Sequence, residues 1–238
     1  MDKKLEKTEI KPFRALFVLI MMLSLSFSFG QENEILLKEY DPVSLYKIPR
    51  TFPVKAKFPV IDVHSHPYAK SESEIKKWVE TMDKAGIEKT ILLTYQTGQA
   101  FDSIYDLYSK YEDRFEIWCG IDYTGYNEPG WSQNAINELV RCYNKGARGV
   151  GELGDKGEGL SYSQPTAAKG MHIDDDRMAP LLKMCGELGM PVNIHVAEPF
   201  WMYQPIDKHN DGLMNAKKWQ IDTTKNNISG HAALLKTL

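Results

Sequence analysis

From residue 57 onward, short runs of apolar and often β-branched residues alternate with longer stretches in which apolar residues return every three or four positions. The short runs are typical of strands, and the longer stretches are typical of amphipathic helices. Strands are predicted at residues 59–64, 90–95, 115–122, 147–152 and 191–196. Because strand and helix alternate, the pattern predicts an α/β fold with a parallel sheet and crossover helices.

The ends of the predicted helices carry their own signals. Ser71 or Ser73 can cap a helix over residues 74–84, because a serine oxygen accepts a hydrogen bond from the first turn. A second helix is predicted over residues 175–188, where apolar side chains repeat at helical spacing. Glycine, which commonly ends helices, stands shortly before three of the strands, at Gly86, Gly146 and Gly189.

Two long segments interrupt the regular spacing of about 30 residues per strand-helix unit. Residues 153–174, rich in glycine and serine, follow the fourth strand, and residues 198–225 follow the fifth. Both segments come after the carboxyl end of a strand, which is the end that carries the active site in parallel α/β proteins. We therefore expect them to contribute to substrate specificity.

The first 30 residues differ from the rest of the chain. Five basic residues precede an apolar stretch of about 13 residues, and small residues follow it up to Gly30. This layout is typical of a secretory signal peptide, and the stretch is shorter than the about 20 residues of a spanning helix. We expect a signal peptide at 1–30, an N-terminal extension at 31–56 and one domain at 57–238. The mature protein would be secreted or periplasmic and free of the membrane; an uncleaved anchor is the alternative.

Composition narrows the class of protein and the partners that it can bind. The chain is 42% hydrophobic and 26% charged, as is usual for a globular domain, and its net charge is −3. No basic cluster occurs beyond the N-terminus, so we expect no nucleic-acid partner. The three cysteines lie inside apolar patterns and their number is odd, which favours buried thiols over disulfides.

Two histidines end the first predicted strand. Side chains alternate along a strand, so His64 and His66 are predicted to point to the same side. Neighbouring imidazoles can share one metal ion. Taken alone, the two histidines could instead lie in a solvated loop. Their position at the end of a strand, where the loop begins, favours a metal site.

Two further candidate ligands end later strands. Glu152 lies between glycines at the end of the fourth strand, and an inward carboxylate needs a cation or a metal beside it. His195 ends the fifth strand and faces away from its apolar neighbours; a core histidine bonded to the backbone is the alternative. Candidate ligands at three strand ends together favour a metal site.

Three segments resemble one known family. IDVHSHPY at 61–68, GVGELG at 149–154 and IDDDRMAPLLKMCGELGMPVNIHVAEP at 173–199 are together similar to the amidohydrolase superfamily. The similarity is to the amidohydrolase-related branch, which includes non-oxidative aromatic-acid decarboxylases and lactonases, and it runs from about residue 59 to 195. It implies a (β/α)8 barrel of the TIM type.

The resemblance also implies a divalent metal, most often zinc. His64, His66 and His195 would hold the ion, and Glu152 would be a ligand, a bridge between two ions, or a neighbour of the site. Binuclear members of the family commonly carry a carboxylated lysine on the fourth strand. Glu152 stands there in this chain, which favours one ion or a glutamate-bridged pair.

The family pattern includes a histidine on the sixth strand and a proton-transferring aspartate on the eighth, and neither is found here. His209 and His231 are expected to be surface residues, since the first follows the fifth strand and the second begins a helical pattern. A complete barrel needs about 250 residues. We therefore expect a chain truncated after about five strand-helix units.

These residues predict an enzyme that activates water with a metal and cleaves an amide, ester or lactone bond of a small molecule. Glu152 is the proton acceptor visible in this chain. One alternative is a metal-dependent decarboxylase of a small aromatic acid. The other is a non-catalytic fragment or interaction module, because an incomplete barrel exposes sheet edges. The oligomeric state stays open.

Asp62 has two interpretations. It lies two residues before His64 and therefore on the same face of the first strand. There it can support a metal-binding imidazole, since such rings usually give their second N–H to a carboxylate or carbonyl. Alternatively it forms an ion pair in the interior with Arg148, which parity places on the face of Glu152.

Overall fold

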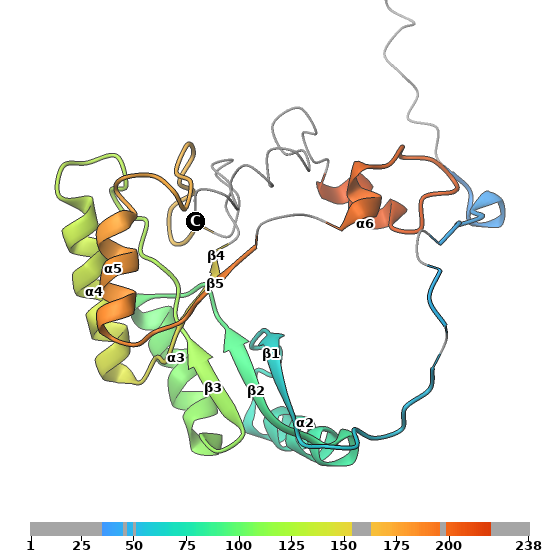
Figure 1. Cartoon of the computed structure of the whole chain (residues 1–238), viewed down its shortest axis with the longest axis horizontal. Coiled ribbons are helices and arrows are strands. Elements are labelled where there is room, and N and C mark those ends of the chain that lie inside the picture. The colour runs from blue at the N-terminus through green and yellow to red at the C-terminus, as the bar shows by residue number, and fades with distance from the viewer. Residues whose placement is uncertain (1–34, 45–46, 50, 154–162, 196–198, 220–238) are drawn as a thin grey trace, which may run out of the picture.

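The structure is a computed structural model that describes residues 35–44, 47–49, 51–153, 163–195 and 199–219 (Figure 1). The expected signal peptide at 1–30 and His231 lie outside these residues, as does part of each long segment after the fourth and fifth strands. None of the helices in the described part of the chain has the length and hydropathy of a membrane span.

Strands and helices alternate along the described chain, as predicted. The first half contains β1 (Val60–Ser65), α2 (Glu72–Ala85), β2 (Ile87–Leu93), α3 (Gly98–Tyr108) and β3 (Phe115–Trp118). The second half contains α4 (Trp131–Lys145), β4 (Val150–Leu153), α5 (Ala179–Glu187) and β5 (Val192–Ile194). Short helical turns η1 (Leu37–Glu39), η2 (Ser109–Tyr111) and η3 (Phe200–Tyr203) and the helix α6 (Leu213–Trp219) complete the elements.

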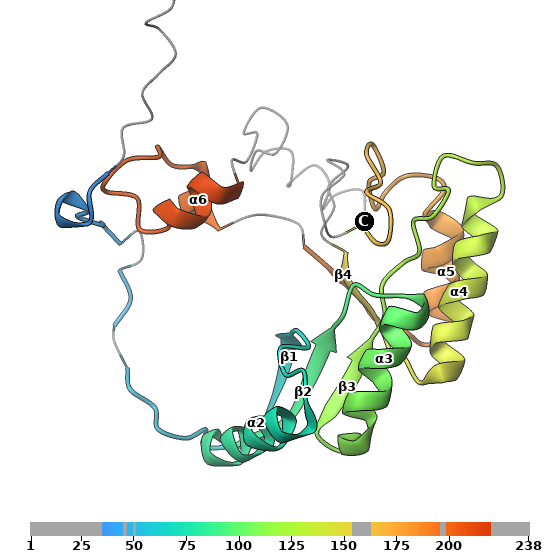
Figure 2. The same ribbon diagram turned by 180° about the vertical axis from the view of Figure 1, so that it is seen from behind.

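All named strand pairs are parallel, which confirms the α/β class. β1, β2 and β3 form one sheet in that order, and β4 pairs with β5 in a second. An isolated bridge between Cys119 and Val150 joins the end of β3 to β4. The strands follow one another in chain order but do not close on themselves within the described residues, so no closed barrel is seen there. Figures 1 and 2 show α3, α4 and α5 along one side of this row of strands.

Local signals at α2 act as the sequence predicts. The Ser71 hydroxyl accepts a hydrogen bond from the Glu74 amide, which satisfies one of the free amides of the first turn. Gly86 ends the helix with a φ of 79°, a left-handed conformation that costs glycine little. β2 begins at Ile87, the next residue, so its start is three residues earlier than predicted.

α5 is shorter than the helix predicted at 175–188. It begins at Ala179, with Pro180 in its first turn, where a proline loses no helical hydrogen bond. The preceding turn is held by Arg177, whose guanidinium donates to both carboxylate oxygens of Asp175 at 2.7 Å. The apolar repeat therefore continues through a turn that is not helical.

One hydrophobic core joins the strands to α2, α3, α4 and α5. Its largest fully buried side chains on these helices are Ile75, Met82, Phe101, Tyr108, Trp131, Leu139 and Leu181. Full burial of one large apolar side chain contributes about 1.5–3 kcal/mol to folding. This shared core therefore packs both sheets against the same set of helices.

The three cysteines are buried and free, which confirms the sequence interpretation. Contact with the Cys119 thiol and burial raise the pKa of Cys142, and burial raises the pKa of Cys185 to about 11. Thiols in such surroundings stay protonated and unreactive, so these cysteines act as small core residues.

The described part of the expected N-terminal extension packs on the segment after β5. The Asp41 and Val43 amides donate to the carbonyls of Lys208 and His209 at 3.0 and 2.9 Å. The Tyr40 hydroxyl donates to the carbonyl of Asn210, whose side chain is buried. His209 is exposed, as predicted.

Candidate metal site

The four predicted ligands stand at the carboxyl ends of their strands. His64 lies in β1 and His66 directly follows Ser65, its last residue; Glu152 lies in β4, and His195 directly follows β5. Because the strands are parallel, these ends share one edge of the row of strands. The row of strands from the two sheets thus brings together residues that are far apart in the sequence.

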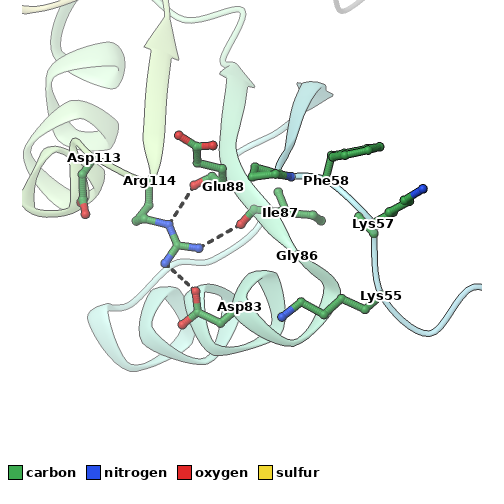
Figure 3. A pocket seen from close by; sticks show the side chains of 11 residues that line it. Lys55, Lys57, Phe58, Asp83, Gly86, Ile87, Glu88, Asp113 and Arg114 are labelled. Carbon is green, nitrogen blue, oxygen red and sulfur yellow. Dashed lines mark hydrogen bonds and ion pairs between the residues drawn. The ribbon is translucent and has the colours of Figure 1, made fainter.

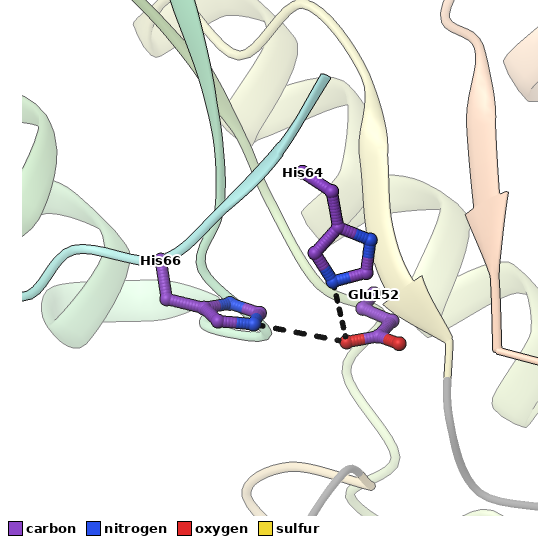
Figure 4. Close-up of side chains that lie close together, drawn as sticks. All are labelled: His64, His66 and Glu152. Atoms are coloured by element: carbon purple, nitrogen blue, oxygen red, sulfur yellow. Dashed lines mark ion pairs between the residues drawn. The ribbon is translucent and has the colours of Figure 1, made fainter. Parts of the chain in front are cut away.

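Two imidazoles face one carboxylate oxygen. The Nε2 atoms of His64 and His66 lie 3.4 and 3.9 Å from Oε2 of Glu152, as Figure 4 shows. The ligand atoms of the three residues all lie within 4.8 Å of one another, so the group could hold a metal ion. The prediction that both histidines point to the same side is confirmed.

The backbone of β2 sets the orientation of His66. Its Nδ1 lies 2.9 Å from the carbonyl oxygen of Leu93, which can only accept a hydrogen bond. We therefore assign the proton of the neutral ring to Nδ1. The lone pair is then on Nε2, the nitrogen that faces Glu152 and the one that a metal ion would need.

Glu152 is the buried centre of the group. Its side chain is 4% exposed, Oε1 lies 2.5 Å from Nδ1 of His195, and Oε2 accepts from the Tyr95 hydroxyl at 3.1 Å. Burial alone would raise the pKa of this carboxyl, but His195, His64 and Tyr95 together lower the pKa below its ordinary value of 4.5. The group is therefore an anion at neutral pH.

His195 takes a different place from the other two histidines. Its contact with Glu152 is made through Nδ1 on Oε1, whereas His64 and His66 face Oε2. The group of ligand atoms within 4.8 Å does not include it. Its inward orientation agrees with the parity argument, and its role as a metal ligand stays a prediction.

Asp62 contacts the backbone of His64 and not its ring. Oδ1 accepts from the His64 amide at 3.1 Å. The alternative ion pair with Arg148 is wrong, because the guanidinium donates to the carbonyls of Tyr143 and Ala147 and stacks on the Tyr143 ring, and Asp62 is not among its partners. Arg148 lies two residues before β4 begins, where the alternation of side chains along the strand does not apply.

Sequence reasoning did not single out Tyr95. It follows β2 by two residues and has a φ of 59°, the one positive φ of a non-glycine residue among the described residues. Its hydroxyl lies 3.0 Å from Nε2 of His66 and 3.1 Å from Oε2 of Glu152. No local pattern marks it, because the contact depends on the turn after β2 and on the position of β4.

A cavity of about 580 Å³ lies at the other end of the strands. Residues that precede β1, β2 and β3 line it, including Arg114 (Figure 3). The guanidinium donates to the carbonyls of Ile87 and Glu88 and pairs with Asp83 at 2.8 Å. Arg114 thereby ties α2 to the start of β2, which is a structural role away from the histidines.

Comparison with models of protein families, with curated proteins and with solved structures finds no match to this chain.

Proposed function

We propose that the protein is a metal-dependent hydrolase that binds Zn²⁺ or a similar divalent cation at His64, His66 and Glu152. Its substrate would be a small molecule with an amide, ester or lactone bond. The observation that carries the proposal is the convergence of two imidazole nitrogens and one buried carboxylate oxygen within 4.8 Å. Two histidines and a glutamate form a ligand set of catalytic zinc sites, which leave one position open.

The spacing of the donor atoms fits such an ion. Two ligand atoms about 2.1 Å from a tetrahedral ion lie about 3.4 Å from each other. The Nε2 atoms of His64 and His66 lie 3.4 and 3.9 Å from Oε2 of Glu152. The charge also fits, because the carboxyl is ionised and buried with no Lys or Arg among its described partners.

When bound, an ion of this kind lowers the pKa of a coordinated water toward about 7. The two oxygens of Glu152 would have separate tasks. Oε2 faces the histidines and would bind the ion, whereas Oε1 accepts from His195 Nδ1 and fixes that ring. A proton arriving at Glu152 or His195 would be shared across their contact, and this pair is the proton acceptor that the site offers.

We also propose how the whole fold is built. We infer that the strands are consecutive members of a (β/α)8 barrel. In support, their order along the row equals their order in the chain, they are parallel, and the candidate ligands stand at their carboxyl ends.

The experiment is a metal-reconstitution assay. Metal-free protein is loaded with Zn²⁺, Co²⁺ or Mn²⁺ and assayed for hydrolysis of a panel of lactones, esters and amides, and in parallel for release of CO₂ from aromatic acids. We expect metal-dependent hydrolysis that is lost in a His64→Ala, His66→Ala double variant. The Lys183→Ala variant is the matched control, since Lys183 is exposed on α5. Failure of the wild-type protein to bind any of the three ions would overturn the proposal, and CO₂ release without hydrolysis would replace it with the decarboxylase.

A further inference from the structure

Tyr95 lies against two of the candidate ligands at once. Its ring stacks on His66 with centroids 5.0 Å apart and planes inclined by 22°. Its hydroxyl lies 3.0 Å from Nε2 of His66 and donates to Oε2 of Glu152 at 3.1 Å. These are two of the three ligand atoms that we assign to the metal, and they are 3.9 Å apart.

The backbone holds Tyr95 in a conformation that tyrosine rarely adopts. Its φ of 59° is left-handed, and non-glycine residues in such conformations gather at functional sites. Two contacts accompany it: the Tyr95 amide donates to the carbonyl of Gly151, and Gly120 packs so closely that an added Cβ would lie 2.1 Å from the Tyr95 carbonyl oxygen. The loop is thus tied to the ends of β3 and β4.

We propose that Tyr95 is a positioning residue, which orients His66 and Glu152 for the metal before the ion arrives. This inference rests on the proposed function, because it assigns a task at the same site. The ring stacks on His66 and fixes its plane, and the hydroxyl, which donates its one proton to Oε2, holds Glu152 beside that ring. Without the hydroxyl, Oε2 would keep the contact with His64, whose side chain is 48% exposed. Binding the ion would then require more reordering of the ligands.

The test is Tyr95→Phe, which removes one oxygen and keeps the stacking ring. Tyr108→Phe is the matched control, because the Tyr108 hydroxyl donates to the Ala69 carbonyl in the core. Zn²⁺ affinity is measured by competition with a chromophoric chelator, the Co²⁺ site by its visible spectrum, and folding by thermal unfolding without metal. We expect Tyr95→Phe to weaken Zn²⁺ binding by about 10- to 100-fold and to change the Co²⁺ spectrum. Tyr108→Phe should lower the melting temperature and leave both metal readouts unchanged.

The outcomes separate this inference from the proposed function. Equal Zn²⁺ affinity in Tyr95→Phe and wild type would overturn the positioning role and leave the metal site standing. A phenolate-to-metal charge-transfer band in the wild type would also overturn it, because Tyr95 would then be a ligand. Weakened Zn²⁺ binding in Tyr95→Phe, with no hydrolysis by the loaded wild type, would support the positioning role and refute the hydrolase. A wild type that binds no ion would overturn both.

Discussion

Glu152→Gln tests the centre of the site, since it removes one negative charge and preserves the shape. In the wild type, Oε1 lies 2.5 Å from His195 and Oε2 accepts from Tyr95 at 3.1 Å. A glutamine can keep a neutral version of one of these contacts through its amide oxygen, whereas its NH2 group can only donate to the other partner. Hydrogen bonds to charged groups contribute about 1.5–3 kcal/mol and neutral ones about 0.5–1.5 kcal/mol. With two such bonds weakened, we expect Glu152→Gln to lower the free energy of unfolding of the metal-free protein by about 2 kcal/mol at pH 7.

The sign of the pH dependence follows from the direction of the pKa shift. The Glu152 pKa is lowered in the folded state, so the carboxylate stabilises the fold above its ordinary value of 4.5. This contribution is lost as the pH falls through the lowered pKa and the group takes up a proton. The gap in unfolding free energy between wild type and Glu152→Gln should therefore shrink on acidification. A gap that widened would contradict the assigned sign.

The assays are urea unfolding with a chelator at pH 7 and at lower pH, and Zn²⁺ affinity by competition. Loss of a residue that supports a metal ligand weakens metal binding by up to about 100-fold. Glu152→Gln removes a charged ligand itself, so we expect it to weaken Zn²⁺ binding by more than that. Glu138→Gln is the control, because Glu138 is a partly buried carboxylate paired with Arg141 on α4. It should lose stability and keep its Zn²⁺ affinity. Unchanged Zn²⁺ affinity in Glu152→Gln would refute Glu152 as a ligand.

Three further outcomes are expected. The His64→Ala, His66→Ala double variant should lose Zn²⁺ binding, measured by elemental analysis, yet unfold cooperatively, because ligands on the strand ends contribute little to the core; a folded variant that kept its zinc would contradict the site. Asp62→Ala should weaken Zn²⁺ binding by about tenfold through the His64 backbone, whereas Asp62→Asn, which keeps an acceptor, should have a smaller effect; equal effects of the two would contradict this role. Asp175→Asn should cost on the order of 1 kcal/mol in urea unfolding at neutral pH, given the partly exposed partner Arg177. Arg177 lowers the pKa of Asp175 to about 2, so that cost should vanish as the pH falls from about 4 through about 2, and a constant cost would argue against the pair.

Local patterns in the sequence determined much of this protein. Hydrophobic spacing and the Ser71 and Gly86 signals predicted α2, and alternation along β1 predicted that His64 and His66 share a side. These features depend on neighbours within a few residues, so the sequence contains all the information that they need. The parallel arrangement followed equally well from the alternation of strand and helix.

The tertiary structure decided where strands stop and which residues meet. β3 ends at Trp118 and not at 122, and the chain beyond it pairs through isolated bridges, from Cys119 to Val150 and from Asp122 to Gln164. Gly120 then packs against the Tyr95 carbonyl, which accompanies the left-handed turn at Tyr95. The partners of the chain beyond Trp118 lie in distant segments, and apolar spacing along one segment contains no record of them.

Contacts between distant segments also explain why the sequence pointed to the ligands but not to Tyr95. His64, Glu152 and His195 each stood out because a polar group in an apolar strand is unusual, and strand ends meet at a shared edge. Tyr95 is an ordinary residue in a loop, and it joins the site through its backbone conformation and the positions of β1 and β4. A hydrogen bond across 57 residues of sequence, as between Tyr95 and Glu152, is set by the packing of whole strands, so it becomes visible only when the chain is folded.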